Sequence, residues 1–546
     1  MPDANVMEKI VSLCKRRAFI YPASEIYGGI NGFWDYGPLG VLLKNNIRDD
    51  WWRNMVECPP IGPDGHPIDM VGIDTAIIQN PKTWVASGHA ATFADPMRKC
   101  PACGNSFRAD QVWDILAKQS RWFDSLLQEF TPFTGRIDTP RLLHWAQGKG
   151  KRLAPNLALV RNPQVTLSWL ADRVNSYPDQ SPTLPQLVEY LATEQYAATG
   201  PQTPCPECGG PLGEARPFKL MFESYAGLVQ DEDHKVYLRP ETAQGQFLNF
   251  KNIIDTTRVK IPFGVAQIGK SFRNEVTPRN FIFRSREFEQ MEMEWFCHPD
   301  EAAKWYEFWK AERMKWWRGL GVAEANLKFR DHEKDELSHY SKMTVDIEYK
   351  YPFTAPDFGE LEGIAHRGCF DLTQHQTHSG QKLDYFDQEL QLKLKAEGKS
   401  EEEVKARSRY VPNVIEPASG LTRAVLVLLC EAYTEDAQRP SGLFLKFKPK
   451  FAPIKLGIFP LVNKDGMPEV AEKLYLDLRQ KWTCEYDPKQ AIGKRYARMD
   501  EIGTPFCICI DGQTLTDQTV TIRHRDTMQQ DRIAIDKVSA YLSERL

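Results

Sequence analysis

The sequence predicts an α+β fold organised in several domains, and three observations lead to this prediction. Two strand-patterned segments joined by a short turn lie within residues 271–296. Two Cys-x-x-Cys pairs bracket a long stretch interrupted by prolines, which indicates an inserted region. Strand and helix patterns alternate over residues 451–546, which favours a C-terminal α/β unit with a mixed sheet. A chain of 546 residues has room for three or four such domains.

Charge and hydropathy limit the class of protein. The formal net charge is −4, so nucleic-acid binding cannot be argued from global basicity and any RNA surface must be a local patch. The sequence contains no run of about 18 apolar residues, and its first residues lack a secretory apolar region. We therefore expect a cytoplasmic enzyme that does not cross a membrane.

The cysteine pairs predict a metal site. Cys100-Pro-Ala-Cys103-Gly and Cys205-Pro-Glu-Cys208-Gly can each present two thiolates to one tetrahedral ion, around a turn that glycine permits. Four thiolates leave no open coordination position, so the expected ion is a structural Zn²⁺. The alternative is two unrelated pairs of reduced cysteines, because the pairs are far apart in the sequence. Between them, helical patterns at 112–130 and 187–198 flank the proline-rich stretch.

The segment 271–296 carries four arginines and several carboxylates. Arg273 and Glu275 share one face of the first strand pattern, and residues 277–280 supply a turn. The second pattern places five side chains on one face, namely Arg284, Arg286, Phe288, Gln290 and Glu292. Arginine binds phosphate through two parallel hydrogen bonds, whereas Glu275 must accept from an amine such as that of adenine. The segment therefore predicts a nucleotide site.

Two alternatives compete with this interpretation. The segment could be an exposed hairpin whose charged face is solvated, although the sorting of its faces argues against that. Residues 264–271 also satisfy the P-loop pattern, but Val265, Ala266 and Ile268 form an apolar strand where a phosphate-binding loop is needed. Pro278 would soon interrupt the required helix.

A second anion site is predicted at 414–433, where an apolar strand turns into an apolar helix. Arg423 falls in the first helical turn, and a helix N-terminus with an arginine favours an anion.

The helices and strands of the C-terminal unit are predicted from the periodicity of its apolar residues. They are strands at 454–459, 484–486, 506–510 and 519–523 and helices at 468–482, 491–502 and from about 533.

These patterns resemble the class II aminoacyl-tRNA synthetases. The Arg273 segment is similar to their motif 2 and the Arg423 segment to their motif 3. Leu238-Arg-Pro-Glu-Thr-Ala-Gln-Gly245 and Gly359-Glu-Leu-Glu-Gly-Ile-Ala-His-Arg367 narrow the resemblance to the homodimeric glycyl-tRNA synthetases. Shorter matches lie at 32–40, 107–110, 493–496 and 523–526, whereas 135–202 does not match.

The resemblance implies a role for each site residue. Arg273 would hold the ATP α-phosphate and Arg423 the γ-phosphate and adenine, as the catalytic residues. The ATP site would comprise Arg273, Asn274, Glu275, Phe283, Arg284, Arg286, Phe288, Glu360, Leu361, Gly420 and Arg423. Phe288 would stack on the base, and Glu360 would help to hold Mg²⁺. The glycine site would comprise Arg108, Glu241, Phe288, Gln290, Glu292, Glu416 and Ser419.

The resemblance also implies the domain order. An antiparallel-sheet catalytic domain would comprise residues 1–98 and 216–440, with a zinc-knuckle and helical insertion at 99–215. An α/β anticodon-binding domain would occupy 451–546, with Lys494, Arg495 and Arg498 on a basic helical face.

The implied activity is ATP-dependent attachment of glycine to the 3′ end of tRNA-Gly through glycyl-adenylate, by a homodimer. Two alternatives remain. A non-catalytic paralogue would keep the fold but lose residues such as Arg273, Glu275 and Arg423, which are present here. Another class IIa synthetase, for threonine, proline or histidine, would share the ATP motifs.

The sequence departs from the family at one position of the glycine site. Where the family reads Glu-Pro-Ser-Ala-Gly, this chain has Glu416-Pro-Ala418-Ser419-Gly420, so the hydroxyl is displaced by one residue. A one-residue shift in extended backbone turns a side chain to the opposite face. We therefore expect Ser419 to miss the contact that the family serine makes.

Overall fold

The computed structural model describes residues 4–109, 111–112, 115, 205–208, 212–334, 336–338 and 341–546. The chain forms two compact units, one of residues 1–90 and 221–546 and the other of residues 91–220. The helices expected at 112–130 and 187–198 fall outside the described residues except for Val112 and Ile115, and the segment 135–202 lies wholly outside them.

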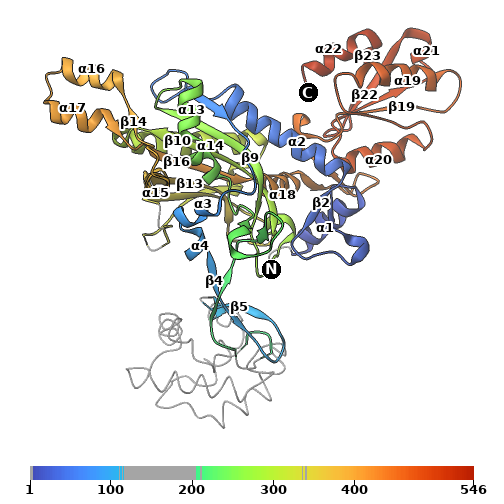
Figure 1. The fold of residues 1–546 in the computed structure, drawn as a ribbon. Helices are drawn as coiled ribbons and strands as arrows, with labels where there is room; N and C mark the ends of the chain where they lie inside the picture. The colour runs from blue at the N-terminus through green and yellow to red at the C-terminus, as the bar shows by residue number, and fades with distance from the viewer. Residues whose placement is uncertain are drawn as a thin grey trace, which may run out of the picture. The chain divides into compact units, whose positions relative to one another are not determined.

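The larger unit is built on a seven-stranded sheet in the order β11-β12-β13-β16-β10-β9-β3 (Figure 1). Neighbouring strands are antiparallel except β3 and β9, which are parallel. The strands are β3 Asp69–Gly72, β9 Phe263–Phe272, β10 Glu287–Cys297, β11 Leu327–Asp331, β12 Met343–Tyr349, β13 Gly359–Gly368 and β16 Asn413–Gly420. The antiparallel sheet predicted for this part of the chain is confirmed, with one parallel pair at its edge.

One face of the sheet is apolar and is covered by α2 Pro38–Trp52, α14 Ala302–Leu320 and α18 Leu421–Ala432. The cause is the alternation along β10, where Met291, Met293 and Trp295 point to this side and are fully buried. Helix α18 is apolar over most of its length, with nine buried residues, so it packs between the sheet and α2. Most of the hydrophobic core lies here.

The opposite face of β10 is polar. Gln290, Glu292 and Glu294 alternate with the apolar residues and point away from the core helices. Helices α12 Ala243–Leu248 and α15 Phe370–Ser379 pack near this face, with α12 against β10 and α15. A central strand with buried carboxylates is not a solvated hairpin, so the first alternative to the nucleotide site is excluded.

Two boundaries in this region differ from the prediction. Strand β9 ends at Phe272, so Arg273 and Glu275 lie in a loop rather than on a strand face. Strand β10 begins only at Glu287, because the connection contains a 3₁₀ turn, Phe281–Phe283, and is longer than the predicted turn at 277–280. Residues 264–271 are strand throughout, so the P-loop alternative is also excluded.

The C-terminal part holds a five-stranded sheet in the order β20-β19-β21-β22-β23. Its elements are β19 Leu456–Pro460, α19 Met467–Leu478, β20 Cys484–Tyr486, α20 Ile492–Ile502, β21 Phe506–Ile510, α21 Thr514–Asp517, β22 Thr519–His524, β23 Gln530–Ala534 and α22 Val538–Ser543. The alternating α/β pattern is confirmed. The closing helix was predicted too early, because residues 530–534 pair with β22 as an edge strand.

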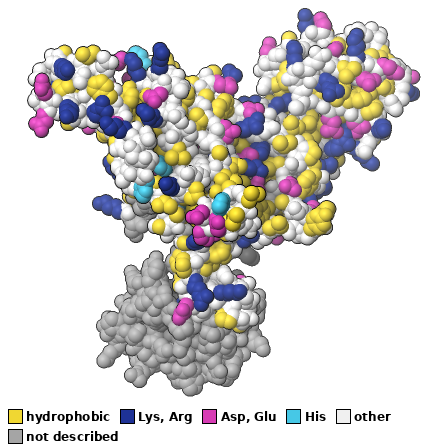
Figure 2. Space-filling view, in the orientation of Figure 1, with side chains coloured by type: hydrophobic (Ala, Val, Ile, Leu, Met, Phe, Trp, Pro, Cys, Tyr) yellow, Lys and Arg dark blue, Asp and Glu magenta, His cyan; other side chains and the backbone are white. Residues whose placement is uncertain are grey.

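The predicted basic face of α20 is wrong for Arg495, and the charge of Arg498 is offset by neighbouring acids. Arg495 is 1% exposed and donates to the carbonyls of Pro460 and Asp487. Arg498 is paired with acidic side chains, including Asp487 at 2.7 Å. Figure 2 shows Lys, Arg, Asp and Glu side chains interspersed over this domain on the face drawn.

The smaller unit contains a three-stranded sheet of β4 Ala94–Lys99, β5 Ser106–Arg108 and β6 Arg216–Lys219, in the order β5-β4-β6.

The remaining α-helices and strands of the larger unit lie outside its two large sheets. They are α1 Ala4–Arg16, β1 Ile20–Pro22, β2 Trp34–Tyr36, α3 Pro81–Ala86, α4 His89–Thr92, β7 Glu223–Tyr225, β8 Lys235–Tyr237, α13 Phe250–Thr257, β14 Tyr385–Phe386, α16 Gln388–Ala396, α17 Glu401–Ser408, β15 Arg409–Tyr410, β17 Tyr433–Glu435 and β18 Leu443–Leu445. Among the described helices, none combines the length and hydropathy needed to cross a bilayer.

Candidate active site

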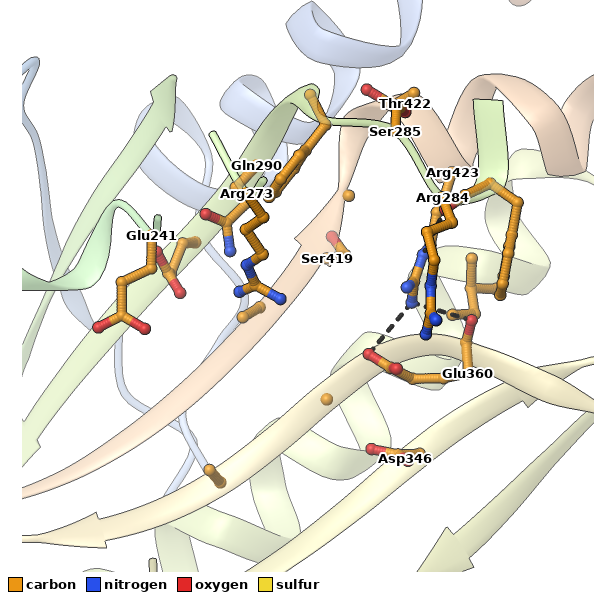
Figure 3. Close-up of a pocket in the computed structure, with 18 of the residues that line it drawn as sticks. Glu241, Arg273, Arg284, Ser285, Gln290, Asp346, Glu360, Ser419, Thr422 and Arg423 are labelled. Carbon is orange, nitrogen blue, oxygen red and sulfur yellow. Dashed lines mark hydrogen bonds and ion pairs between the residues drawn. The ribbon is translucent and has the colours of Figure 1, made fainter. Parts of the chain in front are cut away.

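A pocket of about 360 Å³ opens on the polar face of the large sheet. Most of the predicted site residues line it, although they come from distant parts of the chain. They are Glu241, Arg273, Glu275, Phe283, Arg284, Phe288, Gln290, Glu292, Glu360, Leu361, Glu416, Ser419, Gly420 and Arg423. Figure 3 shows Glu241 at one end, Arg284, Arg423 and Glu360 at the other, and Arg273 between them.

The basic end is organised by Arg423, which the strand-to-helix turn places in the first turn of α18, as predicted. Its Nη1 lies 3.1 Å from Oε1 of Glu360, and its guanidinium lies 4.6 Å from the ring centre of Phe283. The charge of Arg423 lowers the pKa of Glu360, so this carboxylate is ionised. Arg284 lines the same end, 3.9 Å from Glu275. The end therefore offers cations, an aromatic face and one carboxylate.

Arg273 occupies the middle of the pocket. Its Nε donates to the carbonyl of Pro240 at 3.1 Å, and its guanidinium lies 5.4 Å from the ring centre of Phe288. Both contacts hold the side chain across the pocket from its loop. Phe288 thus lies beside Arg273, and Phe283 lies beside Arg423, so each of the two pocket rings is in contact with an arginine.

Two predicted ATP ligands are placed differently. Arg286 donates to the carbonyls of Glu275 at 2.9 Å and Asn31 at 2.8 Å, so it supports the loop that carries Glu275. Asn274 lies between two residues that line the pocket but is not one of the lining residues in the described part of the chain.

The acidic end brings together Glu241, Glu292 and Glu416, all nine-tenths or more buried. Glu292 accepts hydrogen bonds from the backbone and hydroxyl groups of Thr242. Glu241 lies 3.3 Å from His89. Burial acts to raise the pKa of Glu241, but His89 and Arg367 lower it well below its usual value. Burial and the charge of Glu241 raise the pKa of Glu292 instead.

Arg367 is the buried cation that supports the carboxylates of the acidic end. It is 1% exposed, its Nη1 donates to Glu416 at 2.7 Å, and its Nε and Nη2 donate to both oxygens of Asp371 at 2.8 and 2.9 Å. Asp371 lies four residues later, in the first turn of α15. One buried guanidinium therefore ties β13, β16 and α15 together.

Ser419 lies at the pocket wall, but the strand register turns its side chain away. Its cross-strand partners are Met291 and Glu362, whereas Ala418 lies opposite Glu292 and Gly363. The Ser419 hydroxyl is buried and has no hydrogen-bond partner among the described residues. The register therefore places Ser419 and Ala418 on opposite faces of β16, as expected for a shifted hydroxyl, while Ser419 remains one of the residues that line the pocket.

Arg108, the remaining predicted glycine ligand, belongs to the smaller unit. It lies on β5, and its Nη1 is 3.1 Å from Oδ1 of Asp95.

Several pocket residues were missed by the sequence analysis. Asp346 and His332 line the basic end and are joined by a 2.8 Å contact, and His89 and Asp371 support the acidic end. No local pattern marks them, because their partners are distant in sequence. Asp371 alone had a signal, since it follows Arg367 at helical spacing.

The four cysteines of the smaller unit come together as predicted. The sulfur atoms of Cys100 and Cys208 are 3.5 Å apart, and those of Cys103 and Cys205 are 3.7 Å apart. All four lie within 4.8 Å of one another. Sulfurs about 2.3 Å from a central tetrahedral ion would be separated by similar distances, so the donor set fits zinc.

Comparisons with known proteins agree with this geometry. Residues 455–545 match the anticodon binding domain family. The chain is 43% identical to a glycine–tRNA ligase of Rhodopirellula baltica, over 99% of both chains. It is 42% identical to a glycine–tRNA ligase of Caldanaerobacter subterraneus, over 100% of both chains.

Among solved structures, the chain is similar to a prolyl-tRNA synthetase from Cryptosporidium parvum complexed with halofuginone and AMPPNP. The TM-score is 0.55 at 11% identity, over 98% of this chain and 74% of that one. At this identity the likeness concerns the fold alone.

Proposed function

This chain belongs to the glycine–tRNA ligase family, and from that premise we propose how its pocket performs the family's reaction. It is an aminoacyl-tRNA synthetase that joins glycine to tRNA-Gly with ATP. The observation that carries the assignment of roles is the polarity of the pocket, with arginines at one end and buried glutamates at the other.

ATP occupies the basic end. Arg273 contacts the α-phosphate, and Arg284 and Arg423 contact the outer phosphates, because guanidinium forks pair well with phosphate oxygens. Phe288, whose ring lines the pocket beside Arg273, stacks on adenine, as the motif implies. Glu275 accepts a hydrogen bond from the adenine amine.

Glycine occupies the acidic end. Its ammonium group contacts Glu241, Glu292 and Glu416, and its carboxylate points towards Arg273. A substrate without a side chain can be selected only by gripping its two charged ends and excluding volume around Cα. Ala418 and Gly363, opposite one another on neighbouring strands, form a flat wall beside these glutamates.

The reaction proceeds in two steps. The glycine carboxylate attacks the α-phosphorus in line and expels pyrophosphate, and the 3′-terminal ribose hydroxyl of the tRNA then takes the glycyl group and releases AMP. No protein nucleophile is required. The side chains act by positioning the reactants and by stabilising phosphate charge.

Class II synthetases use Mg²⁺ with ATP. The residues that would hold it are Glu360 and Asp346, whose carboxylates line the phosphate end and suit a hard cation. When bound, the ion would neutralise negative charge on the outer phosphates of ATP.

The assignment is tested by pyrophosphate exchange with each of the twenty amino acids. Exchange that depends on glycine alone is expected. Exchange with threonine, proline or histidine would indicate another class IIa specificity, and no exchange with any amino acid would indicate a non-catalytic paralogue.

The four cysteines bind one structural Zn²⁺ per chain, as their sulfur separations support. Cys103→Ser or Cys208→Ser is expected to release the ion and to increase proteolysis of the smaller unit. Elemental analysis of chelator-free protein measures the ion. Wild-type protein without zinc would contradict this site, and Cys369→Ser, which changes a cysteine of the larger unit, serves as the control.

The C-terminal unit binds the anticodon stem and loop. Deletion after Lys450 is expected to spare adenylate formation and to lower tRNA charging. The deletion also removes Asp500, which contacts the buried Arg439 at 2.8 Å. Because Arg439 would be left without this partner, the deletion is best combined with Arg439→Met. Pyrophosphate exchange and charging are compared on protein shown to be folded, and an equal loss of both would contradict a separate role.

The displaced hydroxyl gives a test of the glycine pocket. Ala418→Ser places a hydroxyl on the face of Glu292, and we expect a several-fold lower KM for glycine, consistent with one hydrogen bond worth about 0.5–1.5 kcal/mol. Ser419→Ala is the matched control and should leave KM unchanged. The opposite pattern would mean that Ser419 contacts glycine.

The active form is a homodimer that works in the cytoplasm, where tRNA is charged. Strongly exposed Ile26 and Tyr27 support an interface near the N-terminus. Light scattering measures the mass in solution.

A further inference from the structure

Glu294 is a buried carboxylate that the reaction described above does not use. It lies on β10 two residues after Glu292 and on the same polar face. It is 0% exposed, and neither of its oxygens has a hydrogen-bond partner among the described residues. An ionised carboxylate without partners is too costly to bury, so this group must hold a proton or face a cation.

The strand register shows which group faces it. Glu292 pairs with Ala418 and Trp295 pairs with Ile415, so the same register places Glu294 opposite Glu416. One carboxylate oxygen from each of Glu292, Glu294 and Glu416 lies within 4.8 Å of the others. Like charges directly opposite on neighbouring strands repel, so three buried carboxyl groups this close do not all ionise together. Within the cluster Glu292 and Glu416 are hydrogen-bonded to each other, whereas Glu294 interacts with Glu416 through charge alone.

The surrounding charges do not neutralise the cluster. The acids that face it from the packed elements are Glu241, Glu292, Glu416 and Asp371 of α15, and the basic groups are Arg367 of β13, His375 of α15, His89 of α4 and the buried Arg239, which interacts with Glu292. Arg367 is already shared between Glu416 and Asp371, and His89 contacts Glu241. Burial, followed by the charge of Glu416, raises the pKa of Glu294 well above its usual value. Burial and Glu292 raise that of Glu416 as well.

We propose that the cluster of Glu292, Glu294 and Glu416 holds one proton in the empty pocket, with Glu294 as the member that has no other partner, and that the ammonium group of glycine displaces this proton to water. The proposal rests on the function proposed above, because it takes Glu416 as a contact of the ammonium group. Glu294 is then a positioning residue, which keeps the empty pocket close to neutral and lets its charge appear only when the substrate cation arrives. One positive charge leaves as another enters.

The exchange makes glycine binding depend on pH in a defined direction. Below the raised pKa of the cluster the proton competes with the ammonium group, so affinity for glycine increases as pH rises. With one proton exchanged, Kd falls about tenfold per pH unit in this range. Above the raised pKa the cluster has already lost this proton without glycine, and Kd becomes constant.

Calorimetric titration of the full-length protein with glycine tests the exchange. Measured over a series of pH values, each in two buffers with different heats of ionisation, wild-type protein is expected to release about one proton per glycine bound below the raised pKa of the cluster. Glu294→Gln has the size of the protonated acid but no proton to give up. Its binding should release close to none, and its Kd should vary little with pH.

Glu289→Gln is the matched control, because Glu289 lies on the same strand and its carboxylate pairs with Lys44 at 2.9 Å. It should release protons as the wild type does. Glycine binding by wild-type protein without proton release would overturn the proposal, whether or not Glu294→Gln folds. Proton release equal to that of the wild type by a folded Glu294→Gln variant would also overturn the proposal. Glycine-dependent pyrophosphate exchange is measured first. If exchange is present but proton release is absent, the proton proposal fails while the proposed function stands.

Discussion

Arg273→Ala is expected to lower glycyl-adenylate formation by about 10²–10³-fold. The side chain lies in the middle of the pocket, fixed by its hydrogen bond to Pro240 and its contact with Phe288. Its charge faces the position where the α-phosphorus gains negative charge in the transition state. Loss of this donor should therefore reduce kcat in pyrophosphate exchange more than it raises KM for glycine, which is bound by the acidic end.

Arg279→Ala provides the control for this prediction. Arg279 is exposed in the same loop, so its removal changes the loop's charge without removing a group from the pocket. Exchange in this variant should stay within a few-fold of wild type. Near-normal exchange by Arg273→Ala would show that the α-phosphate is held elsewhere.

Local sequence patterns predicted the parts of the fold that depend on local chemistry. The alternation along β10, the turn that places Arg423 and the Cys-x-x-Cys spacing all act over a few residues, and the structure has them where they were expected. Errors occurred where pairing between distant segments decides the outcome. Residues 530–534 became an edge strand because β22 offered a partner, and Arg273 left the strand because the pairing of β9 with β10 stops at Phe272.

The candidate site shows the same division. Arginines and glutamates of the motifs could be assigned to the pocket, but the direction of Arg286 depends on the carbonyls of Asn31 and Glu275. The role of Glu294 depends on its register with Glu416 and could not be read from either strand alone. Residues such as His89 enter the site only through folding.

Arg367→Met should lower the free energy of unfolding by about 3–5 kcal/mol and abolish glycine activation. The substitution preserves most of the apolar volume but removes the cation that contacts Glu416 at 2.7 Å and both oxygens of Asp371. Two buried carboxylates would then lack their shared partner, and their burial without a cation is the main cost. Urea unfolding followed by tryptophan fluorescence measures the loss.

Arg409→Met is the matched control, since Arg409 contacts Asp384 at the similar distance of 2.8 Å while its side chain is 50% exposed. Solvent screens that pair, so its loss should cost at most about 1 kcal/mol. Equal, small costs for the two variants would mean that water reaches the acidic end and screens its charges. Glu294 would then need no proton, so this comparison also tests the dryness on which proton exchange by glycine depends.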